Sequence, residues 1–521
     1  MTAPSHAPVR QSDLNWWERR ATVIMLALIA TIPLFWPTIP PLVDLPGHMG
    51  RYRVQLDGDG SAIRHFYNFH WALIGNLGVD LLIVPLAKLL GLELGVKLIV
   101  MAIPAMTVAG LLWIAREVHG RVQPTALFAL PLAYGHPFLF GFVNFSLSMA
   151  LALLAFGLWL RLARLGRQRL RALVFLLISP LIWITHTFGW GMLGILAFSA
   201  ELIRQHDRGI GWFRAWFHAG VQCLTLAPPI LLMILWRSGH VTGQTGDWFH
   251  WSRKWEWFER TLRDRWEWFD KGSVAVLCAL FVTAIGSRRL EISRNLGATA
   301  LFLLVVFIVL PRIVFGSAYA DMRLTPYLIA IPIIGIRLRP GASVCLARGL
   351  AIAGLLFFGV RIAANTVSFA IASTGYDRAL GALSYVPEHA RLVSFTGYKC
   401  GNSWSTNRME HLGAIAIVRK RAYSNDQWDM AGAQLLTTNK PDAGFFRADP
   451  SQVVVAGKCR DRWRPLNWSL THLPRDAFDY VWLIDPPAFD PALTGGMTQI
   501  WQAGTDRLYR IDDHAMLQAT R

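Results

Sequence analysis

A series of long apolar runs separated by short, arginine-rich linkers constrains this chain more than any other feature. The runs lie at 21–40, 76–90, 95–115, 122–140, 142–160, 172–187, 188–203, 215–236, 273–286, 296–316, 324–336 and 349–371. A bilayer core of about 30 Å is crossed by about 20 helical residues, and many of these runs approach that length. The pattern therefore predicts a polytopic α-helical membrane protein.

Composition supports this prediction and excludes other classes. Of the 521 residues, 54% are hydrophobic and only 16% are charged, whereas soluble domains are about 25% charged. The apolar content also excludes a disordered chain. The net charge of +18 could indicate a nucleic-acid partner, but the arginines lie between apolar runs, as in cytoplasmic loops. We therefore expect a membrane partner and no nucleic acid.

The distribution of basic residues predicts the topology. The linker 161–171 is the most basic and is assigned to the cytoplasm. The other basic linkers are also cytoplasmic under two conditions: 172–203 must be a tight hairpin that turns near His186, and 76–90 must be a re-entrant or interfacial helix. The chain then has about 11 spans in a bacterial inner membrane. Residues 1–20 are cytoplasmic, and the first run is an uncleaved signal anchor.

Three regions follow from this topology. Residues 21–374 form the transmembrane domain, with periplasmic loops 41–75 and 237–272. The second loop alternates tryptophan with charge and predicts an interfacial helix, although the same aromatic rings suit stacking on a sugar. Residues 375–521 form a soluble periplasmic α/β domain.

This C-terminal domain shows no catalytic constellation in its sequence. Strands are predicted at 391–395, 414–418, 452–455 and 480–484, with a hairpin over 500–510. A disulfide between Cys400 and Cys459 and two unpaired thiols are both compatible with the sequence.

Asp44 is the candidate catalytic residue. It follows the first apolar run by a few residues, so its carboxyl should lie at the membrane boundary, where partial desolvation raises its basicity and suits a general base. His48 and Arg51 follow within two helical turns and are candidate substrate-binding residues. The alternative is that Asp44 caps a helix beginning near Pro46.

Further candidate binding residues are ionisable groups within or beside apolar runs. They are His186, Arg312, Asp321 and Arg323. Charged groups at membrane depth are costly and usually face a cavity or a partner. An arginine there can hold a lipid phosphate. The alternatives are a hairpin cap for His186, and a local ion pair with Asp321 or snorkelling for Arg323.

Cofactor evidence is weak. Asp57 and Asp59 have a spacing that could chelate a divalent cation, although their neighbouring glycines favour an ordinary turn. No metal site is assigned. The sequence has no Walker A loop, GxSxG elbow or HExxH motif. Any activated donor should therefore arrive through the membrane.

This layout resembles the GT-C class of membrane glycosyltransferases, especially bacterial enzymes that use polyprenyl-phosphate sugars. The resemblance is carried by Asp44 after the first span, the short helix behind it, the broken hairpin at 184–189 and the C-terminal domain. Residues 44–51 are similar to an Asp-x-Pro-x-His-x-x-Arg pattern in that class.

The resemblance implies an inverting glycosyltransferase. Its partners would be a polyprenyl-phosphate-linked sugar donor and a lipid or glycan acceptor on the periplasmic side. Asp44 would be the base, with Arg312, Arg323 or His186 near the phosphate. A polymerase or ligase of lipid-linked glycans, and a non-catalytic transporter or assembly protein, remain alternatives.

Overall fold

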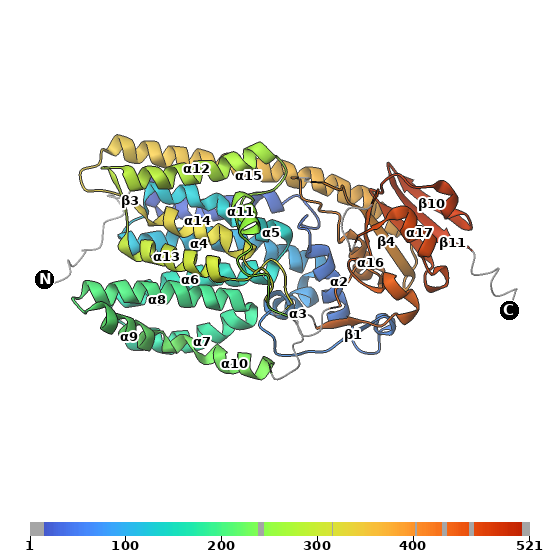
Figure 1. Ribbon diagram of the computed structural model, residues 1–521, viewed down its shortest axis with the longest axis horizontal. Helices are drawn as coiled ribbons and strands as arrows, with labels where there is room; N and C mark the ends of the chain where they lie inside the picture. Colours follow the sequence, from blue (N-terminus) through green and yellow to red (C-terminus); the bar gives the residue numbers. More distant parts are fainter. Residues whose placement is uncertain are drawn as a thin grey trace.

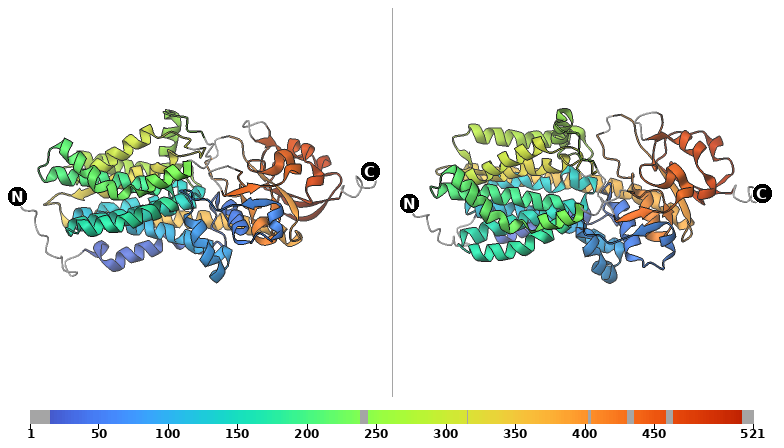
Figure 2. Two further views of the ribbon diagram at one scale, coloured as in Figure 1. Left: turned by 90° about the horizontal axis from the view of Figure 1, so that it is seen from below. Right: turned by 60° about the horizontal axis from the view of Figure 1, so that its bottom comes forward.

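The computed structural model describes residues 15–237, 244–314, 316–401, 404–429, 435–457 and 463–512. A helical bundle occupies one end of the long axis and a mixed α/β domain occupies the other (Figure 1). Both views of Figure 2 show the same end-to-end arrangement, with residues 41–75, in blue, against the C-terminal domain. This segment is called the first outer loop after its predicted topology.

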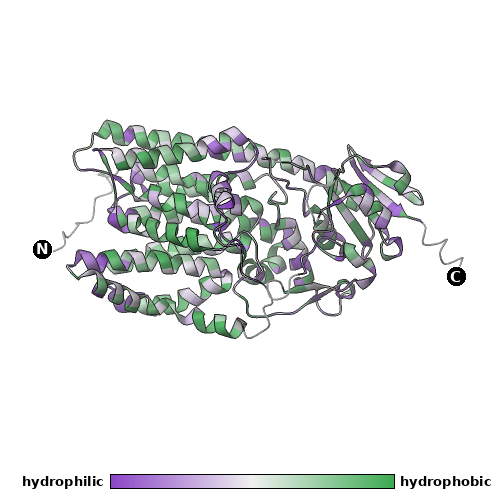
Figure 3. Cartoon of the chain, in the orientation of Figure 1, coloured by the Kyte–Doolittle hydropathy of each residue, from purple (hydrophilic) through white to green (hydrophobic). Residues whose placement is uncertain are grey.

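The bundle is built from the apolar runs of the sequence. Its helices are α1 (Arg20–Ile29), α4 (Leu92–His119), α6 (Val143–Arg164), α7 (Gln168–Thr185), α8 (Thr187–Asp207), α9 (Trp212–Cys223), α10 (Pro228–Arg237), α12 (Glu267–Gly286), α13 (Arg294–Val309), α14 (Thr325–Gly335) and α15 (Val344–Leu380). Apolar residues dominate these helices (Figure 3). Many large apolar side chains remain exposed on α7, α10 and α15, as expected of helices that face lipid.

Five helices among the described residues are long and apolar enough to cross a membrane: α4, α6, α7, α12 and α15. The pair α9 and α10 makes a sixth if it is one span bent by 59°. Arg20–Leu34, Arg294–Val309 and Met322–Gly335 are shorter apolar segments. The protein is therefore a multi-pass membrane protein by length and composition, and the predicted count of about 11 spans is not confirmed.

Four shorter helices lie between the long helices in the sequence, and α2 among them packs against the C-terminal domain. They are α2 (Leu45–Leu56), α3 (Gly78–Leu90), α5 (His136–Phe140) and α11 (Trp251–Glu259). The run 76–90 is the 13-residue helix α3 and is not among the candidate spans. The run 122–140 is a buried 3-10 helix, Pro124–Tyr134, followed by α5. The expected hairpin is present, since α7 ends and α8 begins at His186.

The C-terminal domain contains a seven-stranded mixed sheet with the order β10-β11-β9-β4-β7-β8, in which β5 also pairs with β4. The strands are β4 (Arg391–Gly397), β5 (Tyr423–Ser424), β7 (Val453–Val455), β8 (Arg464–Pro465), β9 (Tyr480–Ile484), β10 (Met497–Ala503) and β11 (Asp506–Ile511). The neighbours β9, β4, β7 and β8 are parallel, and β10 and β11 form the predicted antiparallel hairpin. Helices α16 (Ile415–Lys420) and α17 (Leu466–His472) complete the domain.

Two smaller sheets join distant parts of the chain. β1 (Tyr67–Phe69), in the first outer loop, pairs with β6 (Leu436–Thr438) of the C-terminal domain. β2 (Leu290–Ile292) pairs with β3 (Ile336–Leu338) between bundle helices. The first outer loop is therefore part of the C-terminal fold rather than a separate connection.

One prediction about the C-terminal domain is wrong. The segment 414–418 is not a strand, because 415–420 is the helix α16, which packs against α2. Small residues allow this contact: a Cβ on Gly50 would lie 3.3 Å from the Cβ of Ala414. The boundary at 375 lies inside α15, which continues to Leu380.

Buried ion pairs join the bundle to the C-terminal domain. Arg361 on α15 donates to Asp270 Oδ1 at 2.7 Å, and the indole of Trp404 donates to Asp270 Oδ2 at 2.8 Å. Close by, Arg408 donates to Asp264 and to the carbonyl of Pro41. These bonds connect the first loop, α12, α15 and the segment after β4.

Truncation of one member of this network should destabilise the junction. Arg361→Ala leaves the buried Asp270 without its cation, and we expect a loss of about 3–5 kcal/mol. Arg339→Ala, which removes a half-exposed ion pair with Glu291, should cost about 0–1 kcal/mol. Thermal unfolding in detergent measures both, and equal effects would contradict the prediction.

Candidate functional site

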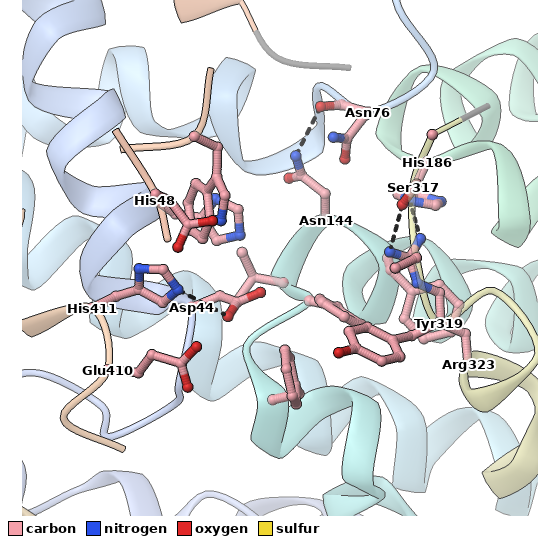
Figure 4. Close-up of a pocket in the computed structure, with 18 residues that line it drawn as sticks. Asp44, His48, Asn76, Asn144, His186, Ser317, Tyr319, Arg323, Glu410 and His411 are labelled. Carbon is pink, nitrogen blue, oxygen red and sulfur yellow. Dashed lines mark hydrogen bonds and ion pairs between the residues drawn. The ribbon is translucent and has the colours of Figure 1, made fainter. Parts of the chain in front are cut away.

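A cavity of about 410 Å³ lies where the bundle meets the C-terminal domain. Its polar lining residues come from the segment between the first apolar run and α3, the start of α6, the α7–α8 turn, the 316–323 turn and the C-terminal domain. They are Asp44, His48, Asn76, Asn144, His186, Ser317, Tyr319, Arg323, Glu410, His411 and Asp449. Figure 4 shows Asp44 and His411 on one side of this group, and His186, Ser317 and Arg323 on the other.

The backbone around Asp44 is held by the α5–α6 connection. The Asp44 amide donates to the carbonyl of Phe140 at 2.9 Å. Gly141 has a φ of 99°, and a Cβ there would lie 2.7 Å from the Asp44 nitrogen. Glycine adopts this left-handed conformation without a steric penalty. The close approach of Gly141 therefore fixes where Asp44 stands.

The side chain of Asp44 is not used as a helix cap. Asp44 is the N-cap residue of α2 by position, but its carboxyl accepts no capping hydrogen bond. The residue is 9% exposed, and its carboxyl faces the cavity (Figure 4). Burial raises the pKa of Asp44 to about 8, although the nearby His411 cation lowers it in part. The carboxyl is therefore unusually basic.

His411 stands behind Asp44 as a charged partner. Its Nδ1 lies 2.5 Å from Asp426 Oδ1, and its Nε2 lies 3.8 Å from Asp44 Oδ1. Burial alone would lower the pKa of His411, but the carboxylates of Asp426, Asp449 and Asp44 together raise that pKa to about 10. An imidazolium between two carboxyl groups offsets part of the cost of ionising Asp44.

Trp428 forms the wall beside these groups. Its ring centroid lies 5.0 Å from that of His48 and 4.6 Å from that of His411. Gly47 must be small, because a Cβ there would lie 2.6 Å from the indole. Gln427 donates to the carbonyl of Gly47 at 3.0 Å. The Pro-Gly-His part of the sequence motif therefore docks α2 onto the C-terminal domain.

Arg323 and His186 present hydrogen-bond donors to the cavity. Nη2 of Arg323 donates to Ser317 Oγ at 3.0 Å, and its Nε is buried without a hydrogen-bond partner among the described residues. Nδ1 of His186 accepts from the Phe188 amide at 3.1 Å, so in the neutral ring the proton lies on Nε2. That Nε2 lies 3.4 Å from Arg323 Nη1. Arg323 and His186 therefore lie in contact with each other on this side of the cavity.

Aromatic rings hold the Arg323 guanidinium in position. Its carbon lies 4.4 Å from the ring centroid of Phe142, 5.5 Å from that of Phe188 and 5.8 Å from that of Phe145. Such contacts stabilise a desolvated guanidinium without using its N–H groups. The cation therefore keeps donor capacity for a ligand.

Three of the predicted site residues lie elsewhere. Arg51 pairs with Asp80 at 2.7 Å inside the α2–α3 contact. Arg312 pairs with Asp247, and both side chains are partly exposed. Asp321 accepts from the Met322 amide at 2.9 Å and lies 3.5 Å from Lys254. None of the three lines the cavity, because each has a partner outside it.

Within the described ranges, no group of three or more His, Cys, Asp or Glu residues could hold a metal ion. The Asp57 and Asp59 carboxylates are used in ion pairs. Asp57 lies 2.7 Å from Arg421, and Asp59 lies 3.2 Å from Arg64. Of the two cysteines for which the sequence left a disulfide or free thiols open, Cys400 is disulfide-bonded, and Cys459 lies outside the described residues.

Sequence reasoning missed every cavity residue of the C-terminal domain. These residues are Glu410, His411, Trp428 and Asp449, which are scattered over a polar segment without a recognisable spacing. Asn144 lies inside an apolar run and donates to the carbonyl of Asn76 at 2.8 Å. A buried asparagine in an apolar helix is the one signal that could have been followed.

Comparison with known proteins adds little at the level of sequence. No protein-family model matches the chain, and the search of curated proteins found no match. Among solved structures, the chain is similar to the crystal structure of ArnT from Cupriavidus metallidurans bound to undecaprenyl phosphate. The identity is 12%, the alignment covers 94% of this chain and 96% of that chain, and the TM-score is 0.44. A similarity at this level identifies neither a substrate nor a reaction for this chain.

The raised pKa of Asp44 predicts a pH-dependent effect of Asp44→Asn on stability. Between pH 3.8 and about 8, the unfolded chain ionises Asp44 while the folded chain keeps the proton. The wild type should therefore lose about 1.4 kcal/mol per pH unit relative to the variant, which does not titrate. Thermal unfolding across this range should show the advantage of the variant growing and then levelling off above about pH 8. A difference that does not change with pH would contradict the burial of this carboxyl.

Proposed function

We propose that this protein is a GT-C-like membrane glycosyltransferase. It transfers a sugar from a polyprenyl-phosphate donor to an envelope acceptor on the periplasmic side of the bacterial inner membrane, with Asp44 as general base. One observation supports the proposal above the others: the buried carboxyl of Asp44 and the guanidinium of Arg323 line one cavity at the end of the apolar helices.

In the proposed reaction, Asp44 takes the proton of the acceptor hydroxyl. The freed oxygen attacks the anomeric carbon of the donor sugar, and the bond from that carbon to the phosphate oxygen breaks. The lipid phosphate leaves with the electron pair, and the anomeric configuration inverts. Arg323 and His186 would stabilise the developing charge on the phosphate, since both line the cavity and Nε of Arg323 has no hydrogen-bond partner among the described residues.

The environment of Asp44 suits this role. A general base acts best when its pKa lies near the working pH, and the pKa of Asp44 is raised to about 8 by burial. His411 acts as a positioning residue, because its cation stabilises the ionised carboxyl without lying on the path of the proton. No step of this reaction is routed through a divalent cation.

Replacing the base, Asp44, should strongly reduce sugar transfer, and replacing its partner, His411, should shift the pH dependence of transfer. Asp44→Asn should lower kcat by a factor of about 100 or more. In the wild type, kcat/KM should rise with pH through about 8. In His411→Gln, the cation that lowers the pKa of Asp44 is lost, so the rising limb should move to higher pH.

The measurement is transfer by purified protein from a polyprenyl-phosphate sugar to envelope glycolipids of a deletion strain. Full transfer by a folded Asp44→Asn variant would refute the assignment of the base. If the pH profile of kcat/KM in His411→Gln were the same as in the wild type, the proposed role of His411 as the partner of Asp44 would be refuted.

Arg323 and Arg312 offer a matched pair of variants for the phosphate contact. Arg323→Ala should raise the apparent KM for the donor about tenfold or more, because a desolvated charge-assisted contact to the phosphate is lost. Arg323→Lys should recover part of the loss. Arg312→Ala removes an arginine that pairs with Asp247 outside the cavity, and donor KM should not change. Equal effects of the two alanine variants would argue against Arg323 as the phosphate ligand.

A further inference from the structure

A second cavity, of about 390 Å³, lies between the outer end of α15 and the C-terminal sheet. It is bordered by Gly397 at the end of β4 and by Asp485 just after β9. These strands are parallel neighbours, and ligands of α/β sheets commonly bind outside the carboxyl ends of such strands. A Cβ on Gly397 would overlap the Asp485 carbonyl, so the two strand ends close one side of the cavity.

Basic side chains dominate the charged lining of this cavity. Arg408 is committed to Asp264 and to the Pro41 carbonyl, and Arg378 pairs with Asp506 at 3.0 Å.

The other two cations of the lining, Arg265 and Lys399, are uncompensated. Both are exposed at the cavity. Neither has a side-chain hydrogen bond or an ion pair to any described residue. Two uncompensated cations in a hollow lined by hydroxyl and amide groups favour an anion with several oxygen acceptors, such as a phosphate.

An apolar stripe on α15 leads to the same cavity. Val360, Val367 and Ile371 are 53%, 50% and 43% exposed. Their spacings of seven and four residues place them on one face of the helix. Ile371 also lines the cavity, and α15 is one of the candidate membrane spans. The cavity therefore adjoins a surface suited to acyl chains, which a soluble phosphate would not require.

We propose that this second cavity binds the phosphate headgroup of an anionic membrane lipid, whose chains lie along the α15 stripe. The site is separate from the cavity around Asp44 and does not depend on the proposed glycosyl transfer. The two cavities share one wall, because Met409 lines the second and His411 lines the first. The lipid would thus brace the segment that carries His411.

Native mass spectrometry of the purified full chain with dioleoyl phosphatidic acid tests the site. Arg265→Ala/Lys399→Ala should weaken binding of this lipid about tenfold or more relative to wild type. Dioleoyl phosphatidylcholine, which has no net charge, should bind weakly to both proteins. The matched control is Arg208→Ala/Arg288→Ala, which removes two exposed arginines at the far end of α8 and after α12 and should bind as wild type does. An unchanged affinity in the Arg265/Lys399 variant would overturn the proposal.

A second comparison separates a lipid from free phosphate. Val367→Ser lies on the stripe outside the cavity and should weaken phosphatidic acid binding. Displacement of the lipid by inorganic phosphate at equal concentration, with no effect of Val367→Ser, would overturn the lipid assignment. Asp44→Asn should retain lipid binding. Absence of glycosyl transfer by the wild-type protein, with this lipid binding intact, would count against the proposed function and not against this site.

Discussion

The free-energy cost of burying a carboxyl group between the helical bundle and the C-terminal domain is the constraint on which the central cavity depends. Asp44 is almost fully buried, and its ionised form is unfavourable there. The chain keeps this group by fixing its backbone against Gly141 and by placing the His411 cation nearby. Such a partly compensated carboxyl retains a proton affinity that a solvated aspartate does not have.

The C-terminal domain is part of this centre. It supplies His411, whose charge is maintained by Asp426, and Trp428, which packs on His48 and His411. The first outer loop in turn supplies β1 to a strand pair with β6 of the C-terminal domain. Because each part completes the other, the cavity depends on the docking of the whole domain and not on the bundle alone.

The bundle provides the opposite side of the cavity. Arg323 lies among three phenylalanine rings and next to the α7–α8 turn at His186. A basic carboxyl on one side of a cavity can accept a proton while a desolvated cation on the other side stabilises a developing negative charge. The second cavity, at the same end of the molecule, also presents cationic side chains, those of Arg265 and Lys399.

Sequence reasoning was most accurate where a local rule applies. Apolar runs predicted the bundle, and alternation and turn residues predicted β9, β10 and β11. It was wrong at 414–418, because a run of buried β-branched and small residues fits a strand or a buried helix equally well. In the folded protein this segment is the helix α16, which packs against α2. Arg51 and Arg312 were selected by residue type, but nothing local reveals that Asp80 and Asp247 pair with them.

By itself, the sequence determined that the chain is a multi-pass membrane protein with a C-terminal α/β domain. Hydropathy and the spacing of apolar residues are local properties that can be read directly from the sequence. The sequence also singled out Asp44, His48, His186 and Arg323 as polar groups in costly places. Only the tertiary structure decided that these four share a cavity with His411 and that Asp44 does not cap α2. The reason is physical: the proton affinity and the partners of a buried group depend on residues hundreds of positions away, which meet only when the C-terminal domain docks on the bundle.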